Sequence, residues 1–111
     1  MNLATEHCIE NAPALDDATV AALLPLVPGW AVIDGKLQTS FAFKNYYETI
    51  AFVNALAWVS HQQDHHPELM VTYKLCAVSY STHSVGRRGF RANDLVCAAR
   101  ASALYVQRAA P

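Results

Sequence analysis

The spacing of hydrophobic residues in the first half of the chain predicts a short helix followed by a β-hairpin. Residues 15–24 contain two aspartates, Asp16 and Asp17, near their start and then aliphatic residues at helical spacing, until Pro25 ends the run. Residues 30–34 and 36–43 are rich in β-forming side chains and meet at Asp34-Gly35. This dipeptide tolerates the positive φ angles of a two-residue turn, so we predict a tight hairpin with one apolar face.

The second half of the chain predicts a long helix, two strands and a final helix. Apolar residues recur at helical spacing over residues 45–65, and Pro67 ends that helix. Residues 69–73 and 75–81 are β-rich and too close together for a crossover, so we expect an antiparallel pair or one bent strand. The last helix is expected to follow a cap at Asn93 or Asp94 and to run through Tyr105.

These elements follow the order αββαββα, which predicts an α+β fold. We expect a two-layer sandwich in which a four-stranded antiparallel sheet carries three helices on one face. Residues 84–92, with two glycines and three arginines, are expected to form a loop before the last helix. Residues 1–14 are expected to be a surface-lying N-terminal tail, and residues 15–111 the domain.

Composition restricts the possible partners. The chain has 111 residues, enough for one core, and 53% of them are hydrophobic but only 15% are charged. Its formal net charge of −1 offers no broad basic surface for nucleic acid or for an anionic membrane. The small charged fraction indicates that some surface is buried by self-association, and a homodimer or homotetramer is expected.

The chain also lacks the marks of export or membrane insertion. Its longest apolar run in the first half is residues 21–28, which is far below the length of about 20 residues that spans a bilayer. No basic start followed by an apolar block is present. Cys8, Cys76 and Cys97 are scattered and odd in number, so we expect free thiols rather than a disulfide framework. A cytoplasmic location is therefore expected.

Histidine is the residue type that carries candidate chemistry. Four of the five histidines, His61, His65, His66 and His83, fall within 23 residues. Because imidazole titrates near neutral pH, this cluster predicts an acid–base site. The candidate orienting groups are Asp64, Tyr73 and Asp94. A metal site is the alternative, since His61 and His65 have the spacing of two ligands on a helix, but no third ligand is evident and we expect neither metal nor cofactor.

The same residues resemble the signature of a known family. The segment from His61 to Pro67, followed by Tyr73, His83 and Asp94, is similar in residues and spacing to the pterin-4a-carbinolamine dehydratase family. The similarity extends over roughly residues 15–107. It implies a small antiparallel sheet backed by helices, which assembles into dimers or tetramers and removes water from a 4a-hydroxy-tetrahydropterin to give a quinonoid dihydropterin. It implies no metal.

The resemblance also implies roles for individual residues. His65 and His83 would act on the leaving hydroxyl group, and His66 would hold the pterin as the third member of the catalytic set. Asp94 would orient the site. The remaining residues of the signature, His61, Pro67 and Tyr73, would bind or orient the substrate.

The segment after His83 departs from the family pattern. Gly86–Ala92 is two residues longer than the usual family loop and contains Arg87, Arg88 and Arg91. These arginines are either a solvated loop or a contact surface for a protein partner. The second interpretation suggests an alternative function, because a branch of this family found with carboxysome genes is thought to assist assembly of ribulose bisphosphate carboxylase (RuBisCO) without dehydrating pterins.

Overall fold

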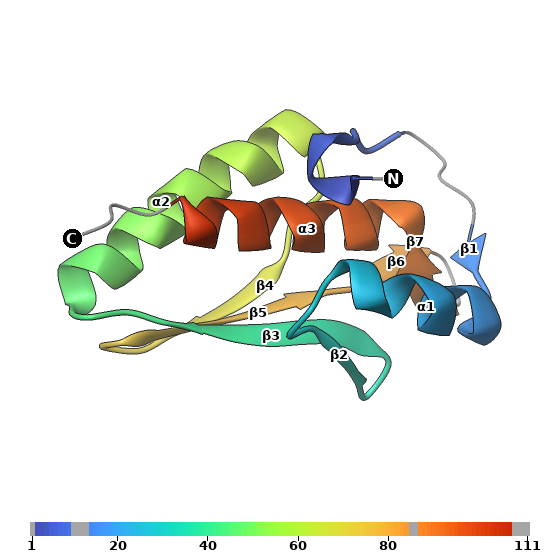
Figure 1. Ribbon diagram of the computed structural model, residues 1–111, viewed down its shortest axis with the longest axis horizontal. Helices are drawn as coiled ribbons and strands as arrows, with labels where there is room; N and C mark the ends of the chain where they lie inside the picture. The colour runs from blue at the N-terminus through green and yellow to red at the C-terminus, as the bar shows by residue number, and fades with distance from the viewer. Residues whose placement is uncertain (1, 10–13, 85–86, 108–111) are drawn as a thin grey trace.

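In the residues that it describes, the computed structural model of the chain contains three α-helices and two antiparallel sheets (Figure 1). The structure describes residues 2–9, 14–84 and 87–107, and for residues 82–84 and 87–91 it describes the backbone alone. The α-helices are α1 (Asp17–Leu23), α2 (Tyr46–Gln63) and α3 (Ala92–Val106). The main sheet contains, in spatial order, β2 (Ala31–Ile33), β3 (Lys36–Ala42), β5 (Leu75–Tyr80) and β4 (Glu68–Val71). The smaller sheet contains, in spatial order, β1 (Ala14–Leu15), β7 (Arg87–Arg91) and β6 (Thr82–Ser84).

Local side chains explain where the first elements begin and turn. The Asp16 carboxylate accepts a hydrogen bond from the Thr19 backbone N–H at 2.8 Å and caps α1. The Asn45 side chain caps α2 in the same way. Between β2 and β3, Asp34 and Gly35 both have positive φ angles, 51° and 73°. The predicted hairpin is therefore confirmed, and its turn has the backbone twist that two-residue hairpins favour.

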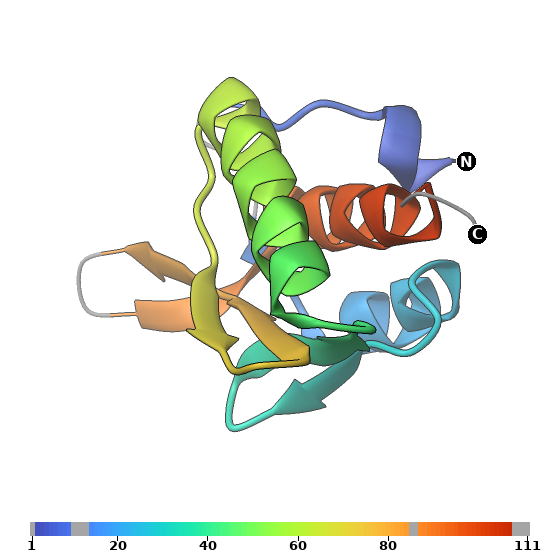
Figure 2. The same ribbon diagram turned by 90° about the vertical axis from the view of Figure 1, so that its left-hand side faces the viewer.

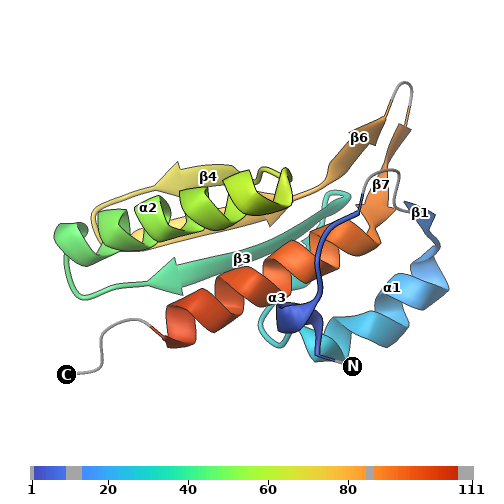
Figure 3. The same ribbon diagram turned by 90° about the horizontal axis from the view of Figure 1, so that it is seen from above.

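Helices α2 and α3 cover one face of the main sheet (Figures 1 and 3). The core between the layers contains the inward-facing residues of β3 and β5 together with Leu56 of α2, which is fully buried. Two hydrogen bonds fasten α3 to the sheet and to the residue before it: the indole N–H of Trp30, which precedes β2, donates to Ser102 at 2.7 Å, and the Tyr105 hydroxyl donates to the Ala42 carbonyl of β3 at 2.7 Å. The predicted α+β fold, with a four-stranded antiparallel sheet and three helices, is confirmed.

The expectation of a loop over residues 84–92 is wrong. Residues on both sides of the segment 85–86, which lies outside the described residues, form a β-hairpin that extends away from the main sheet (Figure 2). Thr82 of β6 pairs with Gly89 of β7, and the other edge of β7 pairs with β1. This second pairing joins residues about 75 positions apart in the sequence, which local pattern cannot reveal. β7 leads directly into α3.

The described part of the N-terminal segment lies against α3. Leu3–Thr5 form a short 3₁₀ helix, η1, and Leu3 is buried in the core. A second 3₁₀ helix, η2 (Leu24–Leu26), follows α1 and contains Pro25. Among the described residues, no helix is long and apolar enough to cross a bilayer.

Candidate active site

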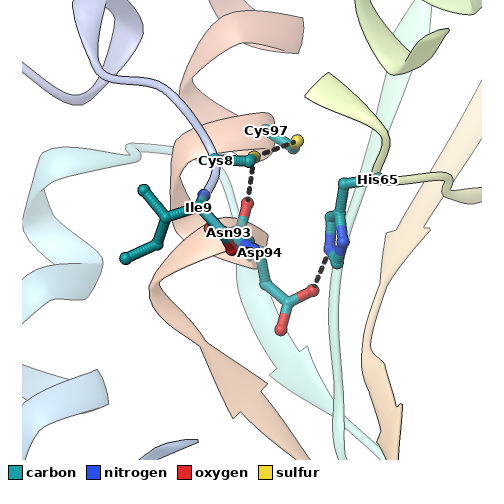
Figure 4. Close-up of polar contacts among 6 residues, drawn as sticks. All are labelled: Cys8, Ile9, His65, Asn93, Asp94 and Cys97. Atoms are coloured by element: carbon teal, nitrogen blue, oxygen red, sulfur yellow. Dashed lines mark hydrogen bonds and ion pairs between the residues drawn. The ribbon is translucent and has the colours of Figure 1, made fainter. Parts of the chain in front are cut away.

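The centre of the candidate site is a hydrogen-bonded pair formed by His65 and Asp94. The His65 Nε2 and Asp94 Oδ1 atoms are 2.6 Å apart (Figure 4). The Asp94 side chain has no solvent exposure, and the His65 side chain is 14% exposed. A buried carboxylate is stable only when hydrogen-bond donors surround it. The contact between His65 and Asp94 is therefore part of the packed interior and not an incidental contact at the surface.

A left-handed turn at the end of α2 places His65. Asp64 has a φ angle of 49°, its N–H bonds to the His61 carbonyl at 3.3 Å, and the His65 N–H bonds to the Ser60 carbonyl at 3.2 Å. This is the usual double closure of a helix end by a left-handed residue. The predicted helix over 45–65 therefore ends at Gln63, and His65 does not share a helical face with His61.

The other half of the pair comes from the first turn of α3. Because β7 ends at Arg91 and α3 begins at Ala92, Asp94 lies in the first turn of the helix, where a carboxylate interacts favourably with the helix dipole. The expected cap at Asn93 or Asp94 is wrong, because α3 already begins at Ala92. The Asn93 side chain instead accepts a hydrogen bond from the Ile9 N–H at 3.0 Å and donates one to the Ile9 carbonyl at 2.8 Å.

An aromatic ring from the sheet completes the packing around His65. The Tyr80 ring lies nearly parallel to the imidazole, with an interplanar angle of 10° and a centroid distance of 5.9 Å. Tyr80 is 1% exposed, and burial raises the pKa of its hydroxyl group well above the usual range. Tyr80 is not among the site residues predicted from the sequence. Its signal was the alternation of Cys76, Val78 and Tyr80, which points all three toward the core face of β5.

The electrostatics of the pair prepare His65 for proton transfer. The hydrogen bond to Asp94 raises the pKa of His65 above its usual value, although partial burial acts in the opposite direction. When Nε2–H donates to the Asp94 carboxylate oxygen, Nδ1 is the ring nitrogen that can exchange a proton. A histidine held in this way can act as a base when neutral and as an acid when protonated.

Only some of the other predicted site residues lie close to the His65–Asp94 pair. His66, which is exposed, and Pro67, which is half-buried, follow His65 directly in the chain. His61 instead stacks on Trp58, with ring centroids 5.8 Å apart, and lines a recess of about 590 Å³. Tyr73 lies in the turn between β4 and β5, and it stacks on Tyr46. The antiparallel register places that turn at the opposite end of the hairpin from Tyr80.

His83 and the arginines can be located by backbone only. His83 lies in β6, three residues after Tyr80 at the end of β5, and its backbone pairs with Arg88 of β7. The side chains of His83, Arg87, Arg88 and Arg91, and residue Gly86 as a whole, lie outside the described part of the structure. Among the described residues, no three His, Cys, Asp or Glu side chains form a group that could hold a metal ion.

Stability should depend on pH through His65. Its raised pKa means that the folded state binds the imidazole proton more tightly than the unfolded state. We therefore expect this contribution to the free energy of unfolding to be full below about pH 6.5, the usual value for histidine, and to disappear as pH rises through the folded-state pKa. Urea unfolding followed by tryptophan fluorescence, repeated between about pH 6 and 9, measures it.

Asp94→Asn is the control for this pH dependence, because it keeps the side-chain shape but removes the charge that retains the proton. The decline in stability over that pH range should largely vanish in the variant. An equal decline in both proteins would mean that another group is responsible.

The fold and the site together define a class of small α+β proteins with a histidine–aspartate pair at the edge of a helix-backed antiparallel sheet. The sequence profile described as "Pterin 4 alpha carbinolamine dehydratase" matches residues 13–104. The chain belongs to this family.

Relatives and solved structures agree with that membership. A protein of Nitrosomonas europaea, provisionally named a pterin-4-alpha-carbinolamine dehydratase, is 48% identical over 88% of this chain and 86% of its own length. A protein of Stenotrophomonas maltophilia with the same provisional name is 49% identical over 95% of this chain and 93% of its own length. The crystal structure of a transcriptional coactivator/pterin dehydratase from Brucella melitensis matches with a TM-score of 0.77 and 27% identity, over 84% of this chain and 99% of that chain.

A second solved structure has a different described role. It is a pterin dehydratase-like protein identified as a RuBisCO assembly factor in the alpha-carboxysome. It matches with a TM-score of 0.53 and 28% identity, over 63% of this chain and 79% of that chain. Proteins with different described functions therefore share a related fold.

Proposed function

We propose that this protein dehydrates a 4a-hydroxy-tetrahydropterin to the quinonoid dihydropterin. The observation that carries the proposal is the 2.6 Å bond between His65, the first histidine of the family's His-His-Pro segment, and the buried Asp94. A small domain rarely buries a carboxylate unless it serves a structural or chemical purpose. Family membership supplies the substrate class.

The reaction needs one proton donated and one removed. The bond from C4a to the hydroxyl oxygen breaks as a general acid protonates that oxygen, and the group leaves as water. A ring N–H of the pterin loses a proton to a general base, which balances the proton supplied to the leaving group. His65 is suited to the first or the second task, because its pKa is raised and Asp94 fixes its tautomer. We assign the complementary role to His83 and pterin binding to His66.

The direct test is turnover by the purified protein. 4a-Hydroxy-tetrahydropterin is generated in situ, and the formation of quinonoid dihydropterin is followed by absorbance. Free imidazole at an equal concentration of histidine side chains is the reference, because it supplies the same functional group without a site. A rate well above the imidazole rate supports the proposal, and a rate equal to it rejects the proposal.

An assembly factor is the second candidate function. It is favoured by the similarity to the RuBisCO assembly factor and by the β6–β7 hairpin, whose second strand contains Arg87, Arg88 and Arg91. Arginine is enriched at protein interfaces because its planar guanidinium group forms forked hydrogen bonds with carboxylates. A projecting hairpin with three arginines could contact an acidic protein surface.

Replacing Arg87, Arg88 and Arg91 together with alanine separates the two functions. If the protein is a dehydratase, turnover of the triple variant should stay within about twofold of wild type, since surface substitutions away from the site usually change stability by less than about 0.5 kcal/mol. If it is an assembly factor, the unaltered protein should lack turnover and bind RuBisCO, and the triple variant should lose that binding. The second pattern would reverse our ranking of the functions.

We also propose that the protein self-associates through an edge of its main sheet. Within the described residues β4 pairs only with β5, and Met70 on β4 is 70% exposed. An edge strand with exposed apolar residues is a template for pairing with another chain. We expect light scattering at micromolar concentration to give a mass at least twice the 12.2 kDa of one chain. A mass of one chain would reject the prediction.

A matched pair of lysine substitutions identifies which edge is used. Met70→Lys places a charge on β4 and should shift the protein toward the monomer. Ile33→Lys places the same charge on β2, the other edge of the sheet, where Ile33 is 51% exposed. That variant should remain associated, and the opposite result would assign the contact to β2.

A further inference from the structure

Two of the three cysteines lie side by side at the point where the N-terminal segment crosses α3. The Sγ atoms of Cys8 and Cys97 are 3.4 Å apart (Figure 4). Cys8 belongs to the N-terminal segment and is half-buried, whereas Cys97 lies in α3 and has no solvent exposure. The two sulfurs come from positions 89 apart in the sequence, so tertiary packing alone brings them together.

Hydrogen bonds on both sides hold Cys8 in this position. Its backbone N–H donates to the Gln63 side chain at 2.7 Å, at the end of α2. The next residue, Ile9, exchanges two hydrogen bonds with the Asn93 side chain. On the other side, the Arg100 Nε–H donates to the Glu6 carbonyl at 2.8 Å. The segment that carries Cys8 is thus fastened at three points, and the approach of its sulfur to Cys97 is a defined contact.

We propose that Cys8 and Cys97 are a redox pair, which closes to a disulfide when the protein meets a peroxide and reopens with a thiol reductant. In the first step the Cys8 thiolate attacks a peroxide oxygen, the O–O bond breaks, and Cys8 becomes a sulfenic acid while hydroxide leaves. In the second step the Cys97 sulfur attacks the Cys8 sulfur, and the sulfenic oxygen leaves as water. Two thiols and one hydrogen peroxide thus give one disulfide and two waters, so peroxide gains the two electrons that the thiols lose.

The surroundings assign different roles to the two thiols. The hydrogen bond from Cys97 lowers the pKa of Cys8, and the charges of His65 and Arg100 act in the same direction, although partial burial opposes them. The pKa of Cys97 is raised, first by its hydrogen bond to Cys8 and then by burial. Since the thiolate is the nucleophile, Cys8 reacts with peroxide and Cys97 resolves the product.

Cys76 is an internal comparison within the same chain. It is fully buried in β5, and burial raises the pKa of its thiol. It should therefore stay reduced while Cys8 and Cys97 react. This selectivity distinguishes a built redox pair from general oxidation of accessible sulfur.

Closing the disulfide would bind the N-terminal segment covalently to the helix that carries Asp94. Cys97 lies three residues after Asp94, about one helical turn, and the Cys8 thiol also approaches the Asn93 carbonyl at 3.7 Å. The bond would also close a long loop of chain, which reduces the conformational freedom of the unfolded state. We therefore expect oxidation to raise Tm by at least about 5 °C, and reduction to reverse the change.

The experiment is peptide mapping of the full-length protein after brief treatment with a small excess of hydrogen peroxide. Free thiols are then blocked, and the protein is digested with trypsin. The expected product joins peptide 1–36 to peptide 92–100, while peptide 75–87, which contains Cys76, carries the blocking group. Dithiothreitol before blocking should abolish the joined product. Cys76→Ser should still form the bond, which makes it the matched control.

Single substitutions test the order of events. Cys97→Ser should stop at the Cys8 sulfenic acid, which dimedone traps, and Cys8→Ser should give neither product. The proposal is overturned if peroxide leaves both peptides unlinked in the wild-type protein, or if Cys76 is oxidised at the same rate as Cys8. If a serine variant fails to fold, the peptide map of the wild-type protein, in which Cys76 is the internal comparison, still decides the matter.

Discussion

His65→Gln is expected to lower the dehydration rate by about 100- to 10,000-fold, the usual contribution of a general acid or base. Glutamine is preferable to alanine, because Asp94 is fully buried and its hydrogen bond to His65 would otherwise be lost. The glutamine amide can donate to the carboxylate, but it cannot exchange a proton near neutral pH. Turnover under saturating substrate is the measurement, with near-UV circular dichroism to establish that the variant is folded.

His61→Ala is the matched histidine control for this experiment. His61 precedes His65 by four residues, but its side chain is exposed and stacks on Trp58 instead of contacting Asp94. We expect its loss to change turnover by less than about tenfold, well below the effect of removing an acid–base group. Wild-type turnover in His65→Gln would contradict our assignment of His65. An equally large loss of turnover in both variants would mean that His61 also belongs to the site, as the family resemblance implies.

Leu56→Ala is expected to reduce the free energy of unfolding by about 2–5 kcal/mol. Leu56 has no solvent exposure and projects from the middle of α2 into the core. Removing three carbons leaves a cavity beneath the helix, and the neighbouring side chains can fill only part of it. Urea unfolding measures the loss. Because α2 ends in the turn that places His65, the variant should lose turnover at temperatures where it begins to unfold.

Asn54→Ala provides the control for the helix. Asn54 is exposed on α2 two residues earlier, and alanine is a better helix former than asparagine. Its effect should lie within about 0.5 kcal/mol of wild type. A loss below about 1 kcal/mol in Leu56→Ala would mean that the packing of α2 on the sheet contributes little to stability.

Local chemistry was enough to predict the elements that depend on neighbouring residues. The hairpin at Asp34-Gly35 needs only two residues that accept positive φ, and α1 needs only a capping aspartate before a helical run. The end of α2 was predicted two residues too late. Pro67 marked the region correctly, but Asp64 adopted the left-handed conformation first, and this conformation is uncommon outside glycine and asparagine-like residues.

Contacts between residues far apart in the chain could not be predicted from the sequence, for a different reason. The β6–β7 hairpin overlaps residues 84–92, which were expected to be a loop because glycine disfavours strands. Its second strand is stabilised partly by Ala14 and Leu15, which lie far away in the chain. The contact of Cys8 with Cys97 has the same origin. Neither pattern nor composition reports on contacts whose partners are separated by most of the sequence.

The sequence alone therefore determined the fold class and pointed to His65 and Asp94, because hydrophobic periodicity and the spacing of a family signature are properties of the chain itself. The tertiary structure decided which candidates meet. It paired His65 with Asp94, stacked the His65 ring on Tyr80, placed His61 against Trp58, and left Tyr73 at the far end of its hairpin. The physical reason is that a proton-transfer site depends on distances below about 3 Å, and these are set by how separate elements pack.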